Sequence, residues 1–290
     1  MVLKSLLGEI PKSNYFISNE NLEISRSVYL RSKVEVLYSG ATLDELNLKM
    51  KSAKLKFNRY KIQYLKTVDG VAYKERMEAL RLIGFAIEGS FALSDPIVEF
   101  ALLRLAGTWH FGFYTRNDDS WKNRKHKPYN YSHAFDVKLA KTIINIAIGN
   151  NFNLKVIDPC CGIGTVVIEG RIIGADITGY ELNPLIAEHC NENLKHFGLK
   201  GDVHNQDMLE ITDDYDVAIL DIPYGHFSLT SIEEQTSLIS KSRDIAKKVI
   251  IISMEEISSL ILSTSLIIKE TCKITKSNAF SRYLYVCESI

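Results

Sequence analysis

The sequence predicts an α/β protein, with a mostly parallel sheet that ends in an antiparallel hairpin and a smaller α+β domain before it. From about Leu154 onward, short β-branched runs alternate with helical stretches. This alternation builds a parallel sheet with helices on both faces. The last two apolar runs are joined only by a short turn at residues 276–278, so we expect them to pair antiparallel.

The N-terminal region has a different pattern. Its expected elements are a basic helix over residues 43–56, an alternating strand over 58–66 and a hairpin that turns near Gly107. We expect residues 1–115 to form this α+β domain. The polar stretch 116–133, interrupted by Pro128, is expected to be a linker, and residues 134–290 to form the second domain.

The second domain should contain seven strands and at least three helices. The expected strands are 155–158, 176–182, 202–206, 217–221, 249–253, 266–275 and 280–287, and the expected helices are 165–173, 184–197 and 232–247. The carboxyl ends of parallel strands meet at one edge of a sheet, where ligands of α/β proteins bind.

The composition is that of a folded, soluble protein. The 290 residues are 46% hydrophobic and 24% charged, and 35 basic residues balance 35 acidic ones. This balance lacks the overall positive charge typical of nucleic-acid binders, although a local patch could serve. No apolar run reaches the length of a membrane span, so we expect no membrane association and a cytoplasmic location. The five cysteines have no metal-ligand spacing, which predicts reduced thiols and no metal.

The stretch VIDPCCGIGTVVIEG, residues 156–170, predicts a nucleotide-type cradle. A strand ending in Asp158, followed by Gly162 and Gly164 before a helix, lets a ligand approach backbone N–H groups and the positive helix end. Val167 stands where a dinucleotide site needs Gly or Ala, which disfavours NAD and FAD. No lysine precedes Thr165, which disfavours a phosphate-binding loop for ATP.

Two later strand ends suggest an adenosine ligand without a pyrophosphate. Glu181 could accept both ribose hydroxyls, and Asp207 could accept from an adenine amine. Leu182 and Met208 could hold the ring between them.

Four motifs, DPCCGIG, GYELN, NQDML and LDIPYG, together resemble those of class I S-adenosylmethionine methyltransferases. The resemblance is to a group of RNA methylases that includes THUMP-containing tRNA guanine-N2 methyltransferases. It implies a Rossmann-like methyltransferase sheet, S-adenosyl-L-methionine as cofactor and a shortened THUMP-like N-terminal domain that docks RNA. The implied cofactor-binding residues are Asp158, Cys160, Gly162, Gly164, Thr165, Glu181, Leu182, Asp207 and Met208. Cys160 and Cys161 then stand where small side chains let the backbone approach the cofactor.

The resemblance places the chemistry at Asp221, Pro223 and Tyr224. Related enzymes carry Asp-Pro-Pro-Tyr here and methylate exocyclic amines of bases. Asp221 and the carbonyl of residue 222 would accept the two amine N–H bonds, and Tyr224 would stack on the base. Ile222 replaces the first proline of the pattern, so the backbone φ angle is no longer locked at this residue.

Basic residues suggest where RNA would bind. Lys122, Arg124, Lys125 and Lys127 form a cluster near the predicted site, and residues 49–66 carry seven basic and no acidic side chains. We therefore expect methylation of an exocyclic amine, such as guanine N2, in structured RNA such as tRNA. Two alternatives stay open: methylation of DNA adenine, a protein or a small molecule, and a cofactor-binding RNA chaperone or assembly partner with little turnover.

Overall fold

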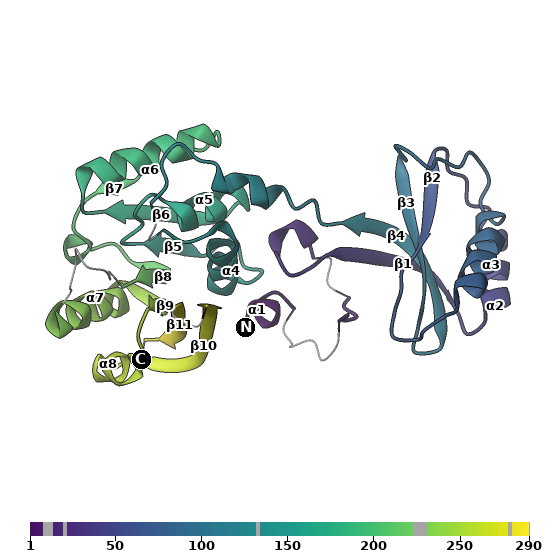
Figure 1. The fold of residues 1–290 in the computed structure, drawn as a ribbon. Coiled ribbons are helices and arrows are strands. Elements are labelled where there is room, and N and C mark those ends of the chain that lie inside the picture. Colours follow the sequence, from purple (N-terminus) through teal and green to yellow (C-terminus); the bar gives the residue numbers. More distant parts are fainter. Residues whose placement is uncertain (8–13, 20–21, 132–133, 223–230, 278–279, 290) are drawn as a thin grey trace. The chain divides into compact units, whose positions relative to one another are not determined.

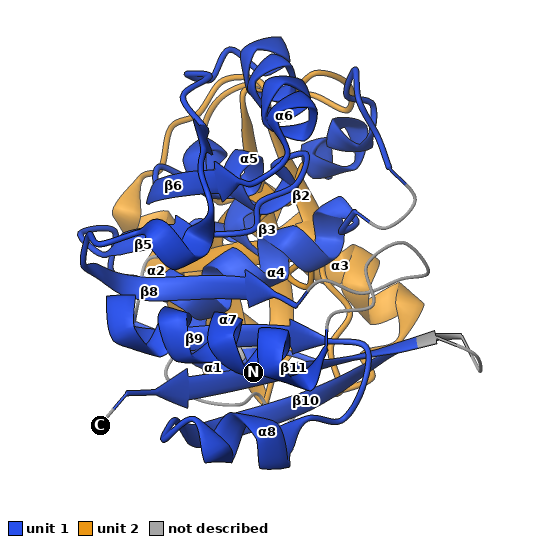
Figure 2. Cartoon of the chain, turned by 90° about the vertical axis from the view of Figure 1, so that its left-hand side faces the viewer, with its two compact units in different colours: residues 1–28, 119–290 blue, residues 29–118 orange. Residues whose placement is uncertain are grey.

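A computed structural model describes residues 1–7, 14–19, 22–131, 134–222, 231–277 and 280–289. The chain forms two compact units: residues 29–118 form one, and residues 1–28 together with 119–290 form the other (Figure 2). Within the described ranges, no helix is both long and apolar enough to cross a membrane.

Residues 29–118 form a four-stranded sheet with two helices (Figure 1). In chain order the elements are β1 (Ser32–Gly40), α2 (Leu43–Ala53), β2 (Tyr60–Tyr64), α3 (Tyr73–Gly84), β3 (Val98–Leu105) and β4 (Thr108–Arg116). The strand order is β1-β4-β3-β2, and only β2 and β3 are parallel. The ring of Phe100 stacks on those of Phe111 and Phe113, with centroid distances of 4.9 and 5.2 Å. The expected helix, strand and hairpin of this region are confirmed.

The larger unit is built on a seven-stranded sheet in the order β10-β11-β9-β8-β5-β6-β7 (Figure 1). Its strands are β5 (Lys155–Asp158), β6 (Asp176–Glu181), β7 (His204–Asn205), β8 (Tyr215–Asp221), β9 (Ala246–Ser253), β10 (Ile267–Ser277) and β11 (Phe280–Glu288). Strands β5 to β9 are parallel, whereas β10 and β11 form an antiparallel hairpin on β9. The predicted mixed sheet is thus confirmed.

Helices cover both faces of this sheet. They are α1 (Val2–Leu7), α4 (Val137–Ile148), α5 (Thr165–Ile172), α6 (Pro184–His196), α7 (Ile232–Ile245) and α8 (Ser258–Ser263). Ala218 and Leu220 of β8 pack in one cluster with Ile239 of α7 and Ile261 of α8. Ile219 lies between them in sequence and is also buried, on the opposite face of the strand. Burial on both faces explains why β8 is a continuous apolar run.

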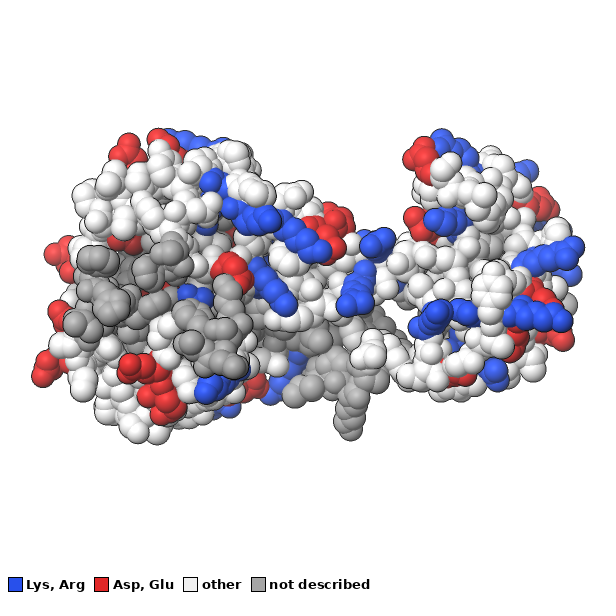
Figure 3. All heavy atoms as spheres, viewed as in Figure 1, with Lys and Arg blue, Asp and Glu red and all other residues white. Residues whose placement is uncertain are grey.

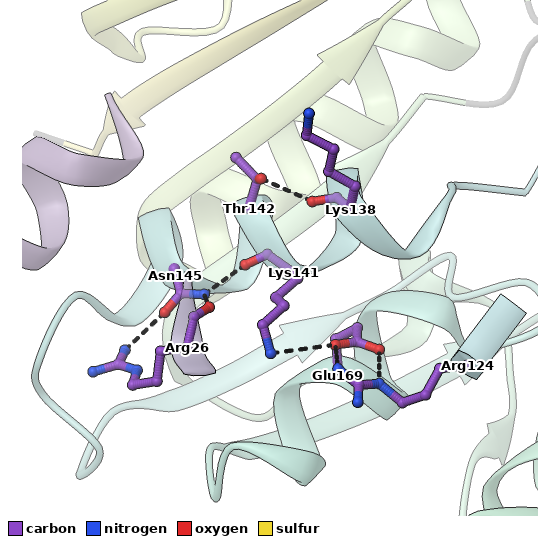
Figure 4. A network of polar contacts seen from close by, with 7 residues as sticks. All are labelled: Arg26, Arg124, Lys138, Lys141, Thr142, Asn145 and Glu169. Atoms are coloured by element: carbon purple, nitrogen blue, oxygen red, sulfur yellow. Dashed lines mark hydrogen bonds and ion pairs between the residues drawn. The ribbon is translucent and has the colours of Figure 1, made fainter. Parts of the chain in front are cut away.

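Residues 1–28 belong to the larger unit, which corrects the prediction of one domain over residues 1–115. The guanidinium of Arg26 donates to the Asn145 side-chain oxygen at 3.0 Å, and the Asn145 amide donates back to the Arg26 carbonyl (Figure 4). The guanidinium also donates to the Asn150 side-chain oxygen at 3.0 Å. Leu6 of α1 is fully buried. Because both Arg26 and Asn145 are buried, these hydrogen bonds are needed to offset the loss of water and they hold the N-terminal segment on α4.

The expected linker 116–133 is also corrected, since from Asp119 onward the chain is part of the larger unit. Residues Ser120–Lys125 form a short 3-10 helix, η2. Beyond it, the backbone N–H of Tyr129 donates to the Asn193 side chain at 3.0 Å. Polar residues that resemble a linker in sequence are here hydrogen-bonded to the domain.

Candidate active site

The loop after β5 has the backbone conformation that its glycines predict. Gly162 and Gly164 have φ angles of +54° and +79°, which other residues rarely adopt. A Cβ atom at Gly164 would lie 2.3 Å from the sulfur of Cys190, so a side chain cannot fit there. Helix α5 then begins at Thr165, and no side chain caps its first N–H groups. The loop therefore presents bare backbone and a positive helix end at the carboxyl edge of the sheet.

A cavity of about 180 Å³ lies beside this loop. Among the residues that line it are Asp158, Cys160, Gly162, Thr165 and Asp221. The structure thus brings four predicted cofactor residues together with the predicted catalytic aspartate, which comes from a different strand.

Asp158 and Asp221 place two buried carboxyl groups on this cavity. Burial raises the pKa of Asp158 well above its usual range, and the charge of Asp221 raises it further. Burial also raises the pKa of Asp221 to about 7, an effect that the positive charge of Arg282 on β11 opposes. A cationic ligand group would stabilise both carboxylates, so the cavity suits a ligand with positive charge.

Asp221 also has an oxygen without a donor. Its Oδ1 is buried and accepts no hydrogen bond from any residue that the structure describes. The next residue, Ile222, is tied to β9, because its N–H donates to the Ile252 carbonyl at 3.0 Å. The other two predicted catalytic residues, Pro223 and Tyr224, lie outside the described residues. A buried acceptor without a partner is rare in native proteins, so this oxygen can accept a hydrogen bond from a group bound in the cavity.

Glu181, at the end of β6, has both carboxylate oxygens occupied. Its Oε2 accepts from the N–H of Gly162 at 3.0 Å, and its Oε1 accepts from the N–H of Asn183 at 2.9 Å. The side chain therefore links the glycine loop to the end of β6. Each carboxylate oxygen keeps a further lone pair, so binding of ribose hydroxyls stays a prediction for Glu181.

The remaining predicted cofactor residues lie beyond the cavity, at the ends of the next strands. Leu182 is 66% exposed, whereas Met208 is buried with its sulfur 3.5 Å from that of Cys160. The Oδ1 of Asp207 accepts from the N–H of Leu209 at 2.9 Å. The cavity is smaller than the roughly 300–1,000 Å³ of pockets that enclose a whole ligand. It can hold one end of a nucleoside ligand, and the rest would extend across the ends of β6 and β7.

The predicted basic cluster is divided by the structure. Lys122 and Lys125 are exposed on η2. Arg124 instead donates to both carboxylate oxygens of the buried Glu169, at 2.6 and 2.8 Å, and Lys141 approaches the same carboxylate at 3.9 Å (Figure 4). Figure 3 shows basic and acidic side chains interspersed on the drawn face of both units, as expected for a chain with no net charge.

Lys127 is turned into the protein as well. It is 8% exposed, and its ammonium donates to the Thr165 hydroxyl oxygen at 2.5 Å. The prediction that all four basic residues contact RNA phosphates therefore needs correction at Arg124 and Lys127, because their charged ends point away from solvent.

Two further residues of the site were missed from the sequence. The guanidinium of Arg282 lies 4.8 Å from the ring centre of Phe135, and Phe135 lines the cavity with Asp221. Arg282 is only 6% exposed. A single arginine in the otherwise uncharged strand 280–287 was a signal that could have identified it. No pattern in the sequence distinguished Phe135 as a residue of the site.

The two adjacent cysteines are packed side chains. Burial raises the pKa of the Cys160 thiol, and a hydrogen bond with Cys190 together with burial raises the pKa of the Cys161 thiol, so both are protonated. The described part of the chain contains no group of three or more His, Cys, Asp or Glu side chains arranged to hold a metal ion.

Comparison with known proteins finds an RNA methyltransferase among the relatives of this chain. Over 127 residues the chain is 30% identical to a tRNA (guanine(10)-N2)-dimethyltransferase of Methanothermobacter thermautotrophicus. This match covers 42% of the chain and 38% of the relative, so the chain spans well under half of the relative's length.

Two solved structures resemble the fold at low sequence identity. TrmN from Thermus thermophilus is 12% identical with a TM-score of 0.47, covering 90% of this chain and 83% of that one. Magnesium protoporphyrin IX methyltransferase from Synechocystis, solved with bound S-adenosylmethionine, is 17% identical with a TM-score of 0.44, covering 59% and 93%.

A family described as the RMKL-like methyltransferase domain matches residues 124–272, just over half of the chain. This match confirms methyl transfer as the class of chemistry and, with it, S-adenosyl-L-methionine as the cofactor. The predicted Rossmann-like sheet is confirmed by the strand order and strand directions described above. The chain belongs to the RMKL-like methyltransferase domain family.

Proposed function

We propose that this protein methylates an exocyclic amine of a base in structured RNA, with guanine N2 of tRNA as the target. The observation that carries the proposal is the buried Oδ1 of Asp221, an acceptor without a donor on the wall of the cofactor cavity. The name of the 30% identical relative, a tRNA guanine-N2 dimethyltransferase, supports the choice of base.

The residues present fit S-adenosylmethionine, which supplies an electrophilic methyl group when bound. Gly162 lines the cavity and leaves the loop open to close approach, and the acids Asp158 and Asp221 suit a ligand that carries an ammonium and a sulfonium. Glu181 would accept from the ribose hydroxyls. Asp207 and Met208 would meet the adenine end beyond the cavity.

Asp221 would orient the target amine. The lone pair of an aryl amine is delocalised into its ring, so the nitrogen must pyramidalise before it attacks a methyl group. A carboxylate that accepts one N–H, with the Ile222 carbonyl accepting the other, holds the nitrogen in that geometry. Because the methyl donor is already reactive, this orientation is the main contribution of the chain.

The RNA would be held by surfaces outside the cavity. We propose that the exposed Lys122 and Lys125 of η2 contact phosphates, together with basic side chains of residues 29–118. Arg124, which is held by Glu169, and the buried Lys127 take no part in that contact.

The test is to identify the methylated product. The purified protein is incubated with S-adenosylmethionine carrying a labelled methyl group and with unmodified tRNA, and the digested nucleosides are analysed by mass spectrometry. We expect labelled N2-methylguanosine. Label in adenosine of a matched DNA duplex, or label in no nucleoside at all, would contradict the proposed substrate.

A further inference from the structure

Lys127 is a buried lysine that forms no ion pair with any acid in the described part of the chain. Its nearest described hydrogen-bond partner is a neutral hydroxyl, that of Thr165, at 2.5 Å. The acid closest to it in this region, Glu169, is already bound by Arg124 and approached by Lys141, and within the described ranges no carboxylate forms an ion pair with Lys127. Buried charges in native proteins are normally paired, because removing them from water is costly.

The position of Lys127 increases this cost. Thr165 is the first residue of α5, so the ammonium lies at the positive end of a helix whose first N–H groups have no side-chain cap. A cation is disfavoured there and an anion is favoured. The ammonium and the helix end together create a positive potential that a negatively charged ligand group would neutralise.

Thr165 connects Lys127 to the cavity through a hydrogen bond. An ammonium can only donate hydrogen bonds, so the Thr165 oxygen accepts from Lys127 and its own O–H is left to donate elsewhere. Thr165 lines the cavity, whereas Lys127 lies behind it. The Thr165 hydroxyl can therefore donate a hydrogen bond to a ligand in the cavity.

We propose that Lys127 is a positioning residue, which with Thr165 forms the receptor for the carboxylate of the cofactor's amino-acid end. This inference rests on the proposed function, since it assigns one part of the same cofactor site. Asp158 and Asp221 line the same cavity, and a cationic group would stabilise their ionised forms, so the two sides of the cavity are complementary to a zwitterion. Lys127 thereby favours a ligand that carries a carboxylate over one that lacks it.

Titration of Lys127 follows from its surroundings. Burial lowers its pKa to about 8, while Glu169 on α5 and Cys190 on α6 act in the opposite direction. A bound carboxylate favours the charged ammonium and would raise the pKa. Affinity for a carboxylate ligand should therefore fall as pH rises from 8 to 9, by up to about fivefold.

The experiment compares two ligands by calorimetric titration: S-adenosylhomocysteine, and the same molecule without its carboxylate. The variants are Lys127→Met, which keeps the length of the side chain without its charge, and Lys195→Met, a control at an exposed lysine of α6. We expect the unaltered protein to prefer the carboxylate ligand by about 10- to 100-fold, the range for a charged hydrogen bond. Lys127→Met should lose most of this preference and Lys195→Met should keep it.

A second variant guards against a folding defect. Thr165→Val removes the hydroxyl and leaves Lys127 in place, so it should lose part of the preference. If Lys127→Met weakened both ligands equally, or if the preference did not decline between pH 8 and 9, Lys127 would only support the fold and the inference would be wrong. If the unaltered protein bound neither ligand, the cofactor site itself would be refuted, a different result.

Discussion

Glu181 and Asp221 are two carboxylates at the ends of strands in one sheet, yet their surroundings are opposite. Both oxygens of Glu181 accept backbone N–H groups, from Gly162 and Asn183. Asp221 instead has a buried oxygen with no described donor. The chain itself completes the hydrogen bonds of Glu181, whereas we propose that a bound substrate completes those of Asp221.

This difference separates a structural role from a reactive one. A satisfied carboxylate such as Glu181 fixes the loop that receives the cofactor. An unsatisfied one costs stability, so it persists where it serves a ligand or a substrate. Replacing Glu181 should therefore affect cofactor binding, whereas replacing Asp221 should affect methyl transfer.

The largest expected effect is that of Asp221→Ala. It removes the acceptor that holds the amine in the transition state, so methyl transfer to tRNA should fall about 100-fold or more while affinity for S-adenosylhomocysteine changes little. Single-turnover kinetics and calorimetry measure the two quantities. Asp214→Ala, at an exposed acid before β8, is the control and should leave both unchanged. Full transfer by Asp221→Ala would rule out the amine-acceptor role.

Glu181→Ala should act on binding instead. It removes a partner of the Gly162 N–H and the proposed acceptor of the ribose, and the affinity for S-adenosylhomocysteine should fall by more than about tenfold. Glu181→Gln, which keeps one carbonyl acceptor, should lie between. Calorimetry that finds unchanged affinity in the alanine variant would remove Glu181 from the cofactor site.

The pH dependence of transfer should report Asp221. Burial raises its pKa to about 7, Arg282 opposes that shift, and Asp158 is the other carboxyl on the cavity. Only the ionised Asp221 carboxylate is a full hydrogen-bond acceptor for the target amine. The rate of methyl transfer should therefore rise with pH by up to about tenfold per unit below 7 and level off above it. Burial favours the neutral form of Asp221 in the folded protein. The stability that this form contributes is lost as pH rises from about 4 to 7, because the buried group must then ionise. A rate that is flat from pH 5.5 to 8 would disagree with this assignment.

Ile222→Pro should have the smallest effect on the site and act on stability. It would restore the Asp-Pro-Pro-Tyr pattern of related enzymes, and from sequence alone we expect it to be tolerated if the Ile222 N–H is not needed. The structure shows that N–H bound to the Ile252 carbonyl at 3.0 Å, and the side chain is buried. We therefore expect a loss of about 1–3 kcal/mol in unfolding free energy, measured by urea denaturation. An unchanged midpoint would show that the hydrogen bond contributes nothing.

Local patterns in the sequence predicted much of this site. The sequence predicted both the strand over residues 155–158 and the helix that begins at Thr165. It did so because the glycines between them permit the positive φ angles of a tight turn. The end of β8 at Asp221 was also predicted, because an apolar run that ends in an acid marks a strand end. The resemblance to methyltransferases supplied the expected role of Asp221.

Contacts between distant segments were not predictable in this way. Arg124 and Lys127 sit in a run of basic residues that resembles an exposed patch. Their burial depends on Glu169 and Thr165, about forty positions further along the chain, and no local pattern encodes that pairing. The attachment of residues 1–28 to α4 through Arg26 escaped prediction for the same physical reason.

The most direct test of the central claim is a structure of the protein with S-adenosylhomocysteine and a guanosine-containing RNA fragment. We predict that Oδ1 of Asp221 accepts a hydrogen bond from the exocyclic guanine amine at about 2.7–3.1 Å, with that nitrogen facing the cofactor's sulfur. A complex in which Oδ1 is bound by a group of the protein, while a different atom of the base faces the sulfur, would contradict the claim.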